Sequence, residues 1–401
     1  MRVLLLALAL AVVPARADVL RAEDFPESLR EAARQIAPVW KDHPDDPSVL
    51  YQVAALYARA QQNADALAIL ARMERTGAGL SPRPRDGFAA IADDPGFQSL
   101  IARLHRRHPP VLRAKVVHTL AEGDLLGEGM AYSQRTGELY LGSFKRKIIA
   151  FKPDGEVREL VPPGRDGFGV AVGLRVDDRR GELWAVSEVI GEPPPGLVVG
   201  VFRFHLPDGA LIRAYPVPKE ARDLLNDLAV AGDGAVYVTS TNNGALIRID
   251  PDTHEVGTFL PPGSLPDPNG ITVAADGNTL YVAGWYAVSR VDRRTKQITR
   301  LAKPRGVADG CFDGLYAYRG DLIGVQNCVH EPGRILRLHL SPDGRRILRA
   351  TVLESSNPLF NGVTTGAIAG DRFYFPANVQ FRKMGTAEPF DPVKILELPL
   401  R

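Results

Sequence analysis

The spacing of apolar residues along the chain changes near residue 110. Between residues 18 and 110, apolar side chains recur every three or four positions, which is typical of amphipathic helices. The pattern is clearest at Leu50, Ala54, Tyr57, Ala66, Leu70 and Met73. These positions predict two packed antiparallel helices, and Asp46 followed by Pro47 predicts the start of the first of them.

From residue 111 onward, apolar and polar residues alternate with a period of two, and the pattern repeats. Each repeat holds a short strand, a turn with Gly or Asp, and a second strand with a large apolar residue; further strands often follow. Six such repeats begin at Glu128, Val172, Asn226, Asn269, Asp313 and Thr365. Four strands in every 45 or so residues, repeated six times, predict a mainly β domain at 111–401: a six-bladed β-propeller.

The last repeat ends after its third strand, KILELPL, which stops at residue 400. A further strand-like segment, AKVVHTL at 114–120, precedes the first repeat. We expect this segment to supply the missing fourth strand of the last blade. Joining both ends of the domain in one blade removes an exposed sheet edge and closes the ring.

The helical segment at 18–110 resembles a single tetratricopeptide unit. Units of this type need neighbours to bury their apolar faces, and only one is recognisable here. We therefore interpret the segment as a helical cap that packs on the propeller. A peptide-binding groove, and with it a protein partner for the helices, is the alternative.

The first residue of each repeat falls on the innermost strand of its blade, which lines the central channel. Four of the six carry a carboxylate or a carboxamide: Glu128, Asn226, Asn269 and Asp313. Around one axis these groups repel each other or stay unsatisfied unless a cation joins them. Calcium prefers such oxygen ligands, whereas zinc and copper sites use His or Cys, which are absent at these positions. The alternative is that each residue only caps a strand end.

The Glu-Gly, Asn-Asp, Asn-Gly and Asp-Gly openings, in this order, resemble the gluconolactonase/regucalcin (senescence marker protein) family. The resemblance covers about 112–401. It implies that Glu128, Asn226, Asn269 and Asp313 bind a divalent cation, usually calcium. It also implies hydrolysis of a lactone or a phosphotriester, with Asp313 as base or nucleophile. The longest loop expected at the channel mouth, 186–200, is a candidate wall for the substrate.

The chain has two cysteines, Cys311 and Cys328, which flank a predicted hairpin with its turn at Arg319 and Gly320. The two positions should face each other across the strands, which permits a disulfide. Two small buried thiols are the alternative.

The first residues of the chain indicate in which cellular compartment the protein resides. Residues 1–17 hold one Arg ahead of an apolar run too short to span a bilayer, and then Ala15-Arg16-Ala17 before Asp18, as in a secretory signal peptide. The mature protein is therefore expected to be periplasmic or secreted. A net charge of +2 without a long basic run disfavours nucleic acid as a partner, and we expect no membrane partner.

Two functions remain open at this point. One is a calcium-dependent hydrolase of the lactonase or esterase type that acts on a small-molecule substrate. The other is a non-catalytic propeller, stabilised by calcium, that binds a protein or glycan partner.

Overall fold

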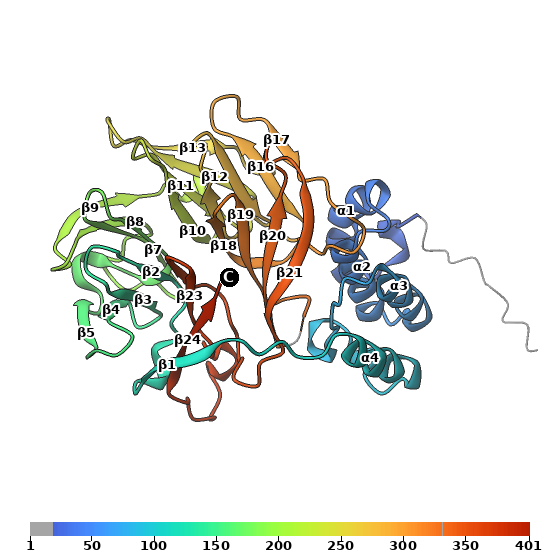
Figure 1. The fold of residues 1–401 in the computed structure, drawn as a ribbon. Coiled ribbons are helices and arrows are strands. Elements are labelled where there is room, and N and C mark those ends of the chain that lie inside the picture. Colours follow the sequence, from blue (N-terminus) through green and yellow to red (C-terminus); the bar gives the residue numbers. More distant parts are fainter. Residues whose placement is uncertain (1–18, 331) are drawn as a thin grey trace, which may run out of the picture.

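The computed structural model describes residues 19–330 and 332–401 of the 401-residue chain. The predicted signal peptide at 1–17 lies outside the described residues. Six four-stranded antiparallel sheets surround a central axis, and four α-helices precede them in this part of the chain (Figure 1). The predicted six-bladed propeller with an N-terminal helical region is therefore confirmed.

Five blades are each built from four consecutive strands, numbered here from the channel outward. Blade 1 holds β2 (Met130–Tyr132), β3 (Leu139–Ser143), β4 (Lys147–Phe151) and β5 (Arg158–Val161). Blade 2 holds β6 (Val170–Asp177), β7 (Glu182–Glu188), β8 (Gly200–His205) and β9 (Leu211–Pro216). Blade 3 holds β10 (Leu225–Val230), β11 (Val236–Ser240), β12 (Ala245–Ile249) and β13 (Val256–Leu260). Blade 4 holds β14 (Ile271–Val273), β15 (Thr279–Ala283), β16 (Val288–Asp292) and β17 (Ile298–Arg300). Blade 5 holds β18 (Phe312–Tyr318), β19 (Asp321–Gln326), β20 (Arg334–Leu340) and β21 (Ile347–Ser355).

Blade 6 joins the two ends of the domain. It contains β22 (Ala367–Ala369), β23 (Arg372–Pro376), β24 (Val393–Pro399) and, outermost, β1 (Lys115–Leu120). The pairing of β1 with β24 is antiparallel and places Leu120 opposite Val393. The predicted closure of the ring by residues 114–120 is thus confirmed, and the last blade has no missing strand.

The apolar core of the propeller lies between neighbouring blades, because each sheet buries both of its faces. Tyr140 of blade 1 and Leu174 of blade 2 belong to one buried cluster. Phe168 lies in the same cluster and packs edge-on against Phe202, with ring centroids 5.1 Å apart. Each fully buried aromatic side chain of this kind contributes roughly 1.5–3 kcal/mol to the free energy of unfolding.

The helical region contains α1 (Glu27–Asp42), α2 (Pro47–Arg59), α3 (Asn63–Thr76) and α4 (Pro95–Arg107). The predicted helix start at Asp46 is confirmed. Its carboxylate accepts hydrogen bonds from the backbone N–H groups of Ser48, at 2.9 Å, and Val49, at 3.4 Å. No helix in residues 19–330 and 332–401 is both long and apolar enough to cross a bilayer.

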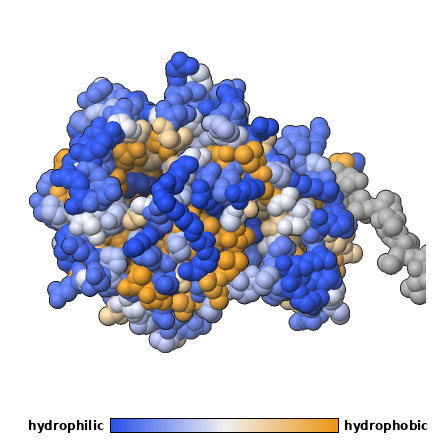
Figure 2. Space-filling model, viewed as in Figure 1, coloured by the Kyte–Doolittle hydropathy of each residue, from blue (hydrophilic) through white to orange (hydrophobic). Residues whose placement is uncertain are grey.

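The helices share one apolar core with loops of blades 4 and 5. Tyr286, Ala308, Cys311 and Val329 of the propeller are buried in the same cluster as the inner faces of the helices. Figure 1 shows the helical region beside these blades, and Figure 2 shows apolar surface continuing among charged residues across the propeller. The region therefore packs as part of the domain, as the cap interpretation expects.

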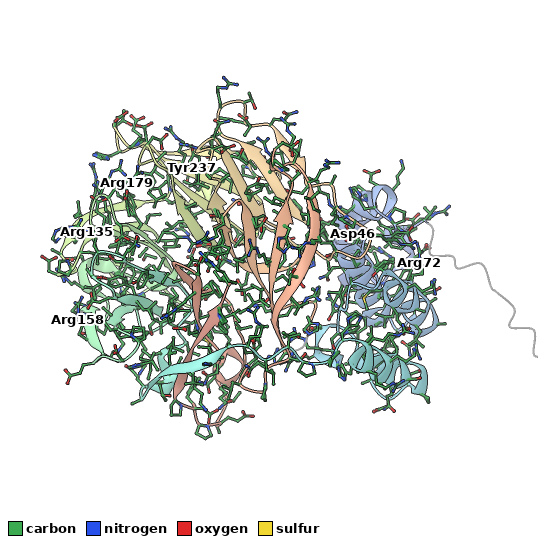
Figure 3. All side chains as sticks on the ribbon, in the orientation of Figure 1. Asp46, Arg72, Arg135, Arg158, Arg179 and Tyr237 are labelled. Carbon is green, nitrogen blue, oxygen red and sulfur yellow. A yellow bond between two sulfur atoms is a disulfide. The ribbon has the colours of Figure 1, made fainter. Side chains whose placement is uncertain are left out.

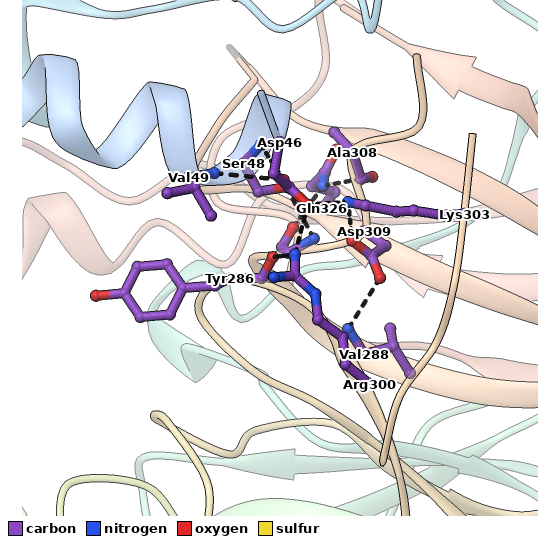
Figure 4. A network of polar contacts seen from close by, with 11 residues as sticks. Asp46, Ser48, Val49, Tyr286, Val288, Arg300, Lys303, Ala308, Asp309 and Gln326 are labelled. Carbon is purple, nitrogen blue, oxygen red and sulfur yellow. Dashed lines mark hydrogen bonds and ion pairs between the residues drawn. The ribbon is translucent and has the colours of Figure 1, made fainter. Parts of the chain in front are cut away.

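A buried charge network crosses this interface (Figure 4). Asp46 is the centre of the network: it forms ion pairs with Arg300 and with Lys303, whose Nζ lies 2.8 Å from the Asp46 carboxylate. Lys303 also pairs with the fully buried Asp309, which accepts a hydrogen bond from the backbone N–H of Val288 at 3.2 Å. Figure 3 shows Asp46 between the helices and the propeller, while Arg135, Arg158 and Arg179 lie at the outer edge of the blades.

The double role of Asp46 gives a test of this interface. Asn caps a helix about as well as Asp, so Asp46→Asn keeps the start of α2. The substitution removes the negative charge that pairs with Arg300 and Lys303, two partly buried cations. We expect a loss of about 2 kcal/mol in the free energy of unfolding, measured by urea denaturation. Asp94→Asn is the matched control, because Asp94 caps α4 through Gly96, at 2.7 Å, without an ion pair among the described residues. Equal losses in the two variants would contradict the interface role.

Candidate functional site

Neighbouring inner strands approach each other closely at the first residue of each repeat. A Cβ atom on Gly129 would lie 2.1 Å from the carbonyl oxygen of Val172 in the next blade. Likewise, a Cβ atom on Gly270 would lie 2.5 Å from the carbonyl oxygen of Asp313. Only glycine fits at such distances from backbone. The glycine that follows a first-position residue therefore brings the next blade against it.

Hydrogen bonds complete the contacts on the other side of the channel. The backbone N–H of Gly314 donates to the carbonyl oxygen of Thr364 at 3.0 Å, which joins blade 5 to blade 6. The Thr365 hydroxyl donates to the carbonyl oxygen of Glu128, which joins blade 6 to blade 1. The six first-position residues therefore form a ring around the axis, called here the mouth ring: Glu128, Val172, Asn226, Asn269, Asp313 and Thr365.

Three members of the mouth ring lie in β-bulges. The pairing of β18 with β19 shifts between Phe312 and Leu315, which places Asp313 in the irregular stretch. Equivalent shifts place Asn226 in the bulge of β10 and Val172 in the bulge of β6. A bulge frees a residue from the regular alternation of the strand and re-aims its side chain, and such bulges often occur beside functional sites.

Glu128 is a buried carboxylate without a partner. Its residue is 9% exposed, and no hydrogen bond or ion pair reaches its carboxylate from the described residues. Burial raises the pKa of Glu128 well above its usual value, and the charges of Asp313 and Asp227 raise it further. A buried carboxylate in its ionised form destabilises the folded protein unless a cation binds beside it.

Asp313 is held by two carboxamides. The side-chain amide of Asn327, the residue after β19, donates to Asp313 Oδ2 at 2.6 Å and to the carbonyl oxygen of Val363 at 3.0 Å. Burial raises the pKa of Asp313 to about 6, although hydrogen bonds from Asn327 and Asn269 oppose the shift. Asp313 is thus held in place by Asn327, with a pKa raised to about 6.

The two asparagines of the mouth ring each have an oxygen to spare. The side-chain amide of Asn226 donates to the Thr241 hydroxyl at 3.2 Å, so its carbonyl oxygen is not engaged in that bond. Asn269 Oδ1 is buried and has no hydrogen-bond partner among the described residues. This orphaned oxygen, on a side chain that already contacts Asp313, is the observation that most directly fits a bound cation.

Sequence reasoning missed two charged residues in the channel, Asp227 and Arg175. Asp227 stands where most repeats have glycine, and that break in the pattern is the signal that could have revealed it. Its carboxylate pairs with Arg175 at 2.6 Å and accepts a hydrogen bond from the backbone N–H of Ile271 at 3.3 Å. Burial raises the pKa of Asp227, while Arg175 opposes the shift. Arg175 also lies over the ring of Tyr316, 4.9 Å from its centroid.

The donor set fits a hard divalent cation. Glu128 and Asp313 offer carboxylate oxygens, and Asn226 and Asn269 offer amide oxygens, which together suit calcium. Three or more His, Cys, Asp or Glu side chains grouped for a metal do not occur in the described part of the chain. The set predicted here has only two carboxylates, and its other ligands are carboxamides.

The hairpin that carries Asp313, and the residue Asn327 that follows it, are tied to the helical region. Arg83, in the segment between α3 and α4, donates to the backbone carbonyl of Asn327 at 2.9 Å. The Sγ atoms of Cys311 and Cys328, the pair expected from the sequence, are bonded to each other, and their Cα atoms are 5.8 Å apart. The helices and the disulfide therefore brace both ends of the hairpin that carries Asp313.

Residues 126–363 match a family model described as the SMP-30/gluconolactonase/LRE-like region. The chain belongs to this family. The match covers more than half of the chain and includes Glu128, Asn226, Asn269 and Asp313, but not the helical region. No curated protein sequence gives a significant match.

Solved structures of other propellers of the SMP-30/gluconolactonase type are similar in fold. A gluconolactonase from Xanthomonas campestris is 17% identical, with a TM-score of 0.50 over 72% of this chain and 97% of its own. A luciferin-regenerating enzyme is 14% identical, with a TM-score of 0.50 over 72% of this chain and 95% of its own. At this identity the likeness concerns the fold alone.

The raised pKa values give a stability prediction for the cation-free protein. Because Glu128 and Asp313 bind protons more tightly when folded, their contribution to stability is present near pH 4 and is lost as the pH rises through the folded values, about 6 for Asp313. Urea unfolding in EDTA should therefore show falling stability from pH 4 to pH 8. The fall should be smaller in Asp313→Asn, whereas the exposed Asp252→Asn should behave like the wild type.

Calcium should reverse this loss at pH 8, because its ligands must be deprotonated to bind. At a calcium concentration 100 times the Kd, binding should add about 2.7 kcal/mol to the free energy of unfolding. Asn269→Ala should reduce this gain, since Asn269 Oδ1 is a proposed ligand. A calcium effect that is the same at pH 5 and pH 8, or the same in the variant, would contradict a cation at the mouth ring.

Proposed function

We propose that the protein hydrolyses a small lactone or ester at the mouth ring with the help of a divalent cation. Glu128, Asn226, Asn269 and Asp313 would hold the cation, and calcium suits their oxygen ligands. The observation that carries the proposal is the pair of buried carboxylates, Glu128 and Asp313. No cationic side chain among residues 19–330 and 332–401 pairs with either of them, whereas neighbouring Asp227 has Arg175. Membership of the SMP-30/gluconolactonase/LRE-like family supports the same reaction class.

A bound cation would polarise the substrate carbonyl and stabilise the negative charge that develops on its oxygen. Asp313 is the residue that we assign to proton transfer. Asn327 donates to Oδ2 and fixes the carboxylate, which would accept a proton from water. The water oxygen then bonds to the carbonyl carbon, the carbon–oxygen bond of the lactone or ester breaks, and the proton passes to the leaving oxygen.

The environment proposed for this chemistry is the periplasm or the outside of the cell. The bond between Cys311 and Cys328 supports this location, because such bonds persist mainly in oxidising compartments. The partner proposed for the mouth ring is accordingly a small molecule that diffuses in, and neither nucleic acid nor a membrane enters the proposal.

A non-catalytic role is the second candidate, and the helical region is the observation that favours it. The helices share a core with blades 4 and 5 and present a further surface that plain catalysis does not require. In that case the cation would only stabilise the propeller, and the helices would contact a protein partner or the propeller would bind a glycan.

Substitution of Asp313 distinguishes the two roles. Asp313→Asn is close in shape but cannot accept the proton, so kcat for lactone or ester hydrolysis should fall by about 10²–10⁴-fold. Circular dichroism and the urea midpoint check that the variant is folded, and Asp252→Asn serves as the exposed carboxylate control. Chelation should abolish the wild-type activity, and added calcium should restore it. Activity that survives both treatments would refute the proposed site.

A further inference from the structure

We propose that the substrate carries an apolar substituent, an alkyl or aryl group, that binds in a pocket beside the mouth ring. This inference rests on the proposed function and specifies its substrate class. The pocket, called here the apolar mouth pocket, has a volume of about 410 Å³ and lies between blades 1 and 2 and the loop that joins β23 to β24. Apolar side chains dominate its lining: Leu126, Phe144, Val170, Ile190, Leu197 and Met384.

The pocket adjoins the mouth ring along the chain itself. Leu126 precedes Glu128 by two residues, and Val170 precedes Val172 by two residues on β6. Two residues of extended chain span at most about 7 Å. A carbonyl group held at the mouth ring can therefore place its substituent in the pocket without a long spacer.

The polar groups at the edge of the pocket already have partners. Both carboxylate oxygens of Glu188 accept backbone hydrogen bonds, from Val189 at 2.9 Å and from Leu225 at 2.8 Å. Lys145 pairs with two carboxylates, Glu122 at 2.8 Å and Asp124 at 2.7 Å. Glu188 and Lys145 are thus committed to the protein. Arg146 also lines the pocket and donates from Nε to the carbonyl oxygen of Phe168 at 3.3 Å. The Arg146 guanidinium is therefore the main polar partner left for the hydroxyl groups of a sugar, against a lining that is mostly apolar.

A polyhydroxylated substrate would therefore lose hydrogen bonds to water on entering this pocket, and that loss is unfavourable. An apolar group would instead cover exposed apolar surface. Ile190 is 50% exposed and Met384 is 39% exposed, although both side chains line the pocket. Large apolar side chains gathered at the rim of a concave site indicate a ligand groove. Ile190 comes from the 186–200 loop, which the sequence suggested as a substrate wall.

The test compares lactones that differ only in their substituent. With the calcium-loaded full-length mature protein, kcat/KM is measured for δ-valerolactone, δ-decalactone and D-glucono-1,5-lactone. Each buried methylene adds about fourfold, so the pentyl group of δ-decalactone should raise kcat/KM by about 10²-fold or more over δ-valerolactone. Gluconolactone should be no better than δ-valerolactone.

Two variants place the effect in the pocket. Ile190→Asp and Met384→Asp should each lower kcat/KM for δ-decalactone by about tenfold or more and leave δ-valerolactone within about twofold. Both residues are exposed, so the fold should tolerate the change. Leu348→Asp is the matched control, because Leu348 is 51% exposed on the outer strand β21 and should leave both substrates unaffected.

Failure of the proposed substrate class and failure of the proposed function give different results. If substituted and unsubstituted lactones react equally, or gluconolactone is preferred, the substrate class proposed here is wrong while the hydrolase remains. If no lactone or ester reacts, the proposed function fails. Calorimetric binding of δ-decalactone, lost in Ile190→Asp but kept in Leu348→Asp, then still supports the pocket, and absence of binding overturns it.

Discussion

The close approach of the inner strands around one axis is the constraint on which the rest of this structure depends. At Gly129 and Gly270 the backbone of the next blade occupies the space that a side chain would need. This approach brings the first residues of the six repeats, which are far apart in the chain, together around the axis. Closure of blade 6 by β1 ties the first strand of the domain to the last and covers the edge of β24.

The buried carboxylates of the channel differ in whether a cationic side chain pairs with them. Asp227 is buried but paired, since Arg175 lies 2.6 Å away and also stacks on Tyr316. Glu128 and Asp313 lie near Asp227, and neither pairs with a cationic side chain in the described part of the chain. The fold thus neutralises one carboxylate internally and leaves two that an added cation can neutralise. The proposed cation site lies where that balance is incomplete.

The helical region contacts loops of blades 4 and 5, and these loops adjoin residues of the mouth ring. Asp46 caps α2 and at the same time holds Arg300 and Lys303, so the start of a helix and the position of a propeller loop depend on one side chain. Arg83 contacts the backbone of Asn327, whose amide holds Asp313. A disulfide braces the same hairpin. The rigid placement of Asp313 therefore depends on contacts from outside the propeller.

The sequence by itself determined the number of blades, the closure by residues 114–120 and the helix start at Asp46, because these follow from local periodicity and capping. It also identified the register of the mouth ring, since equivalent positions of a repeat must share an axis. It did not reveal that Arg175 pairs with Asp227, that Asn327 holds Asp313, or that residues of blades 1, 2 and 6 form one apolar pocket. Those contacts join segments with no local pattern in common, so only the tertiary structure, which packs the blades and loops against each other, could decide them.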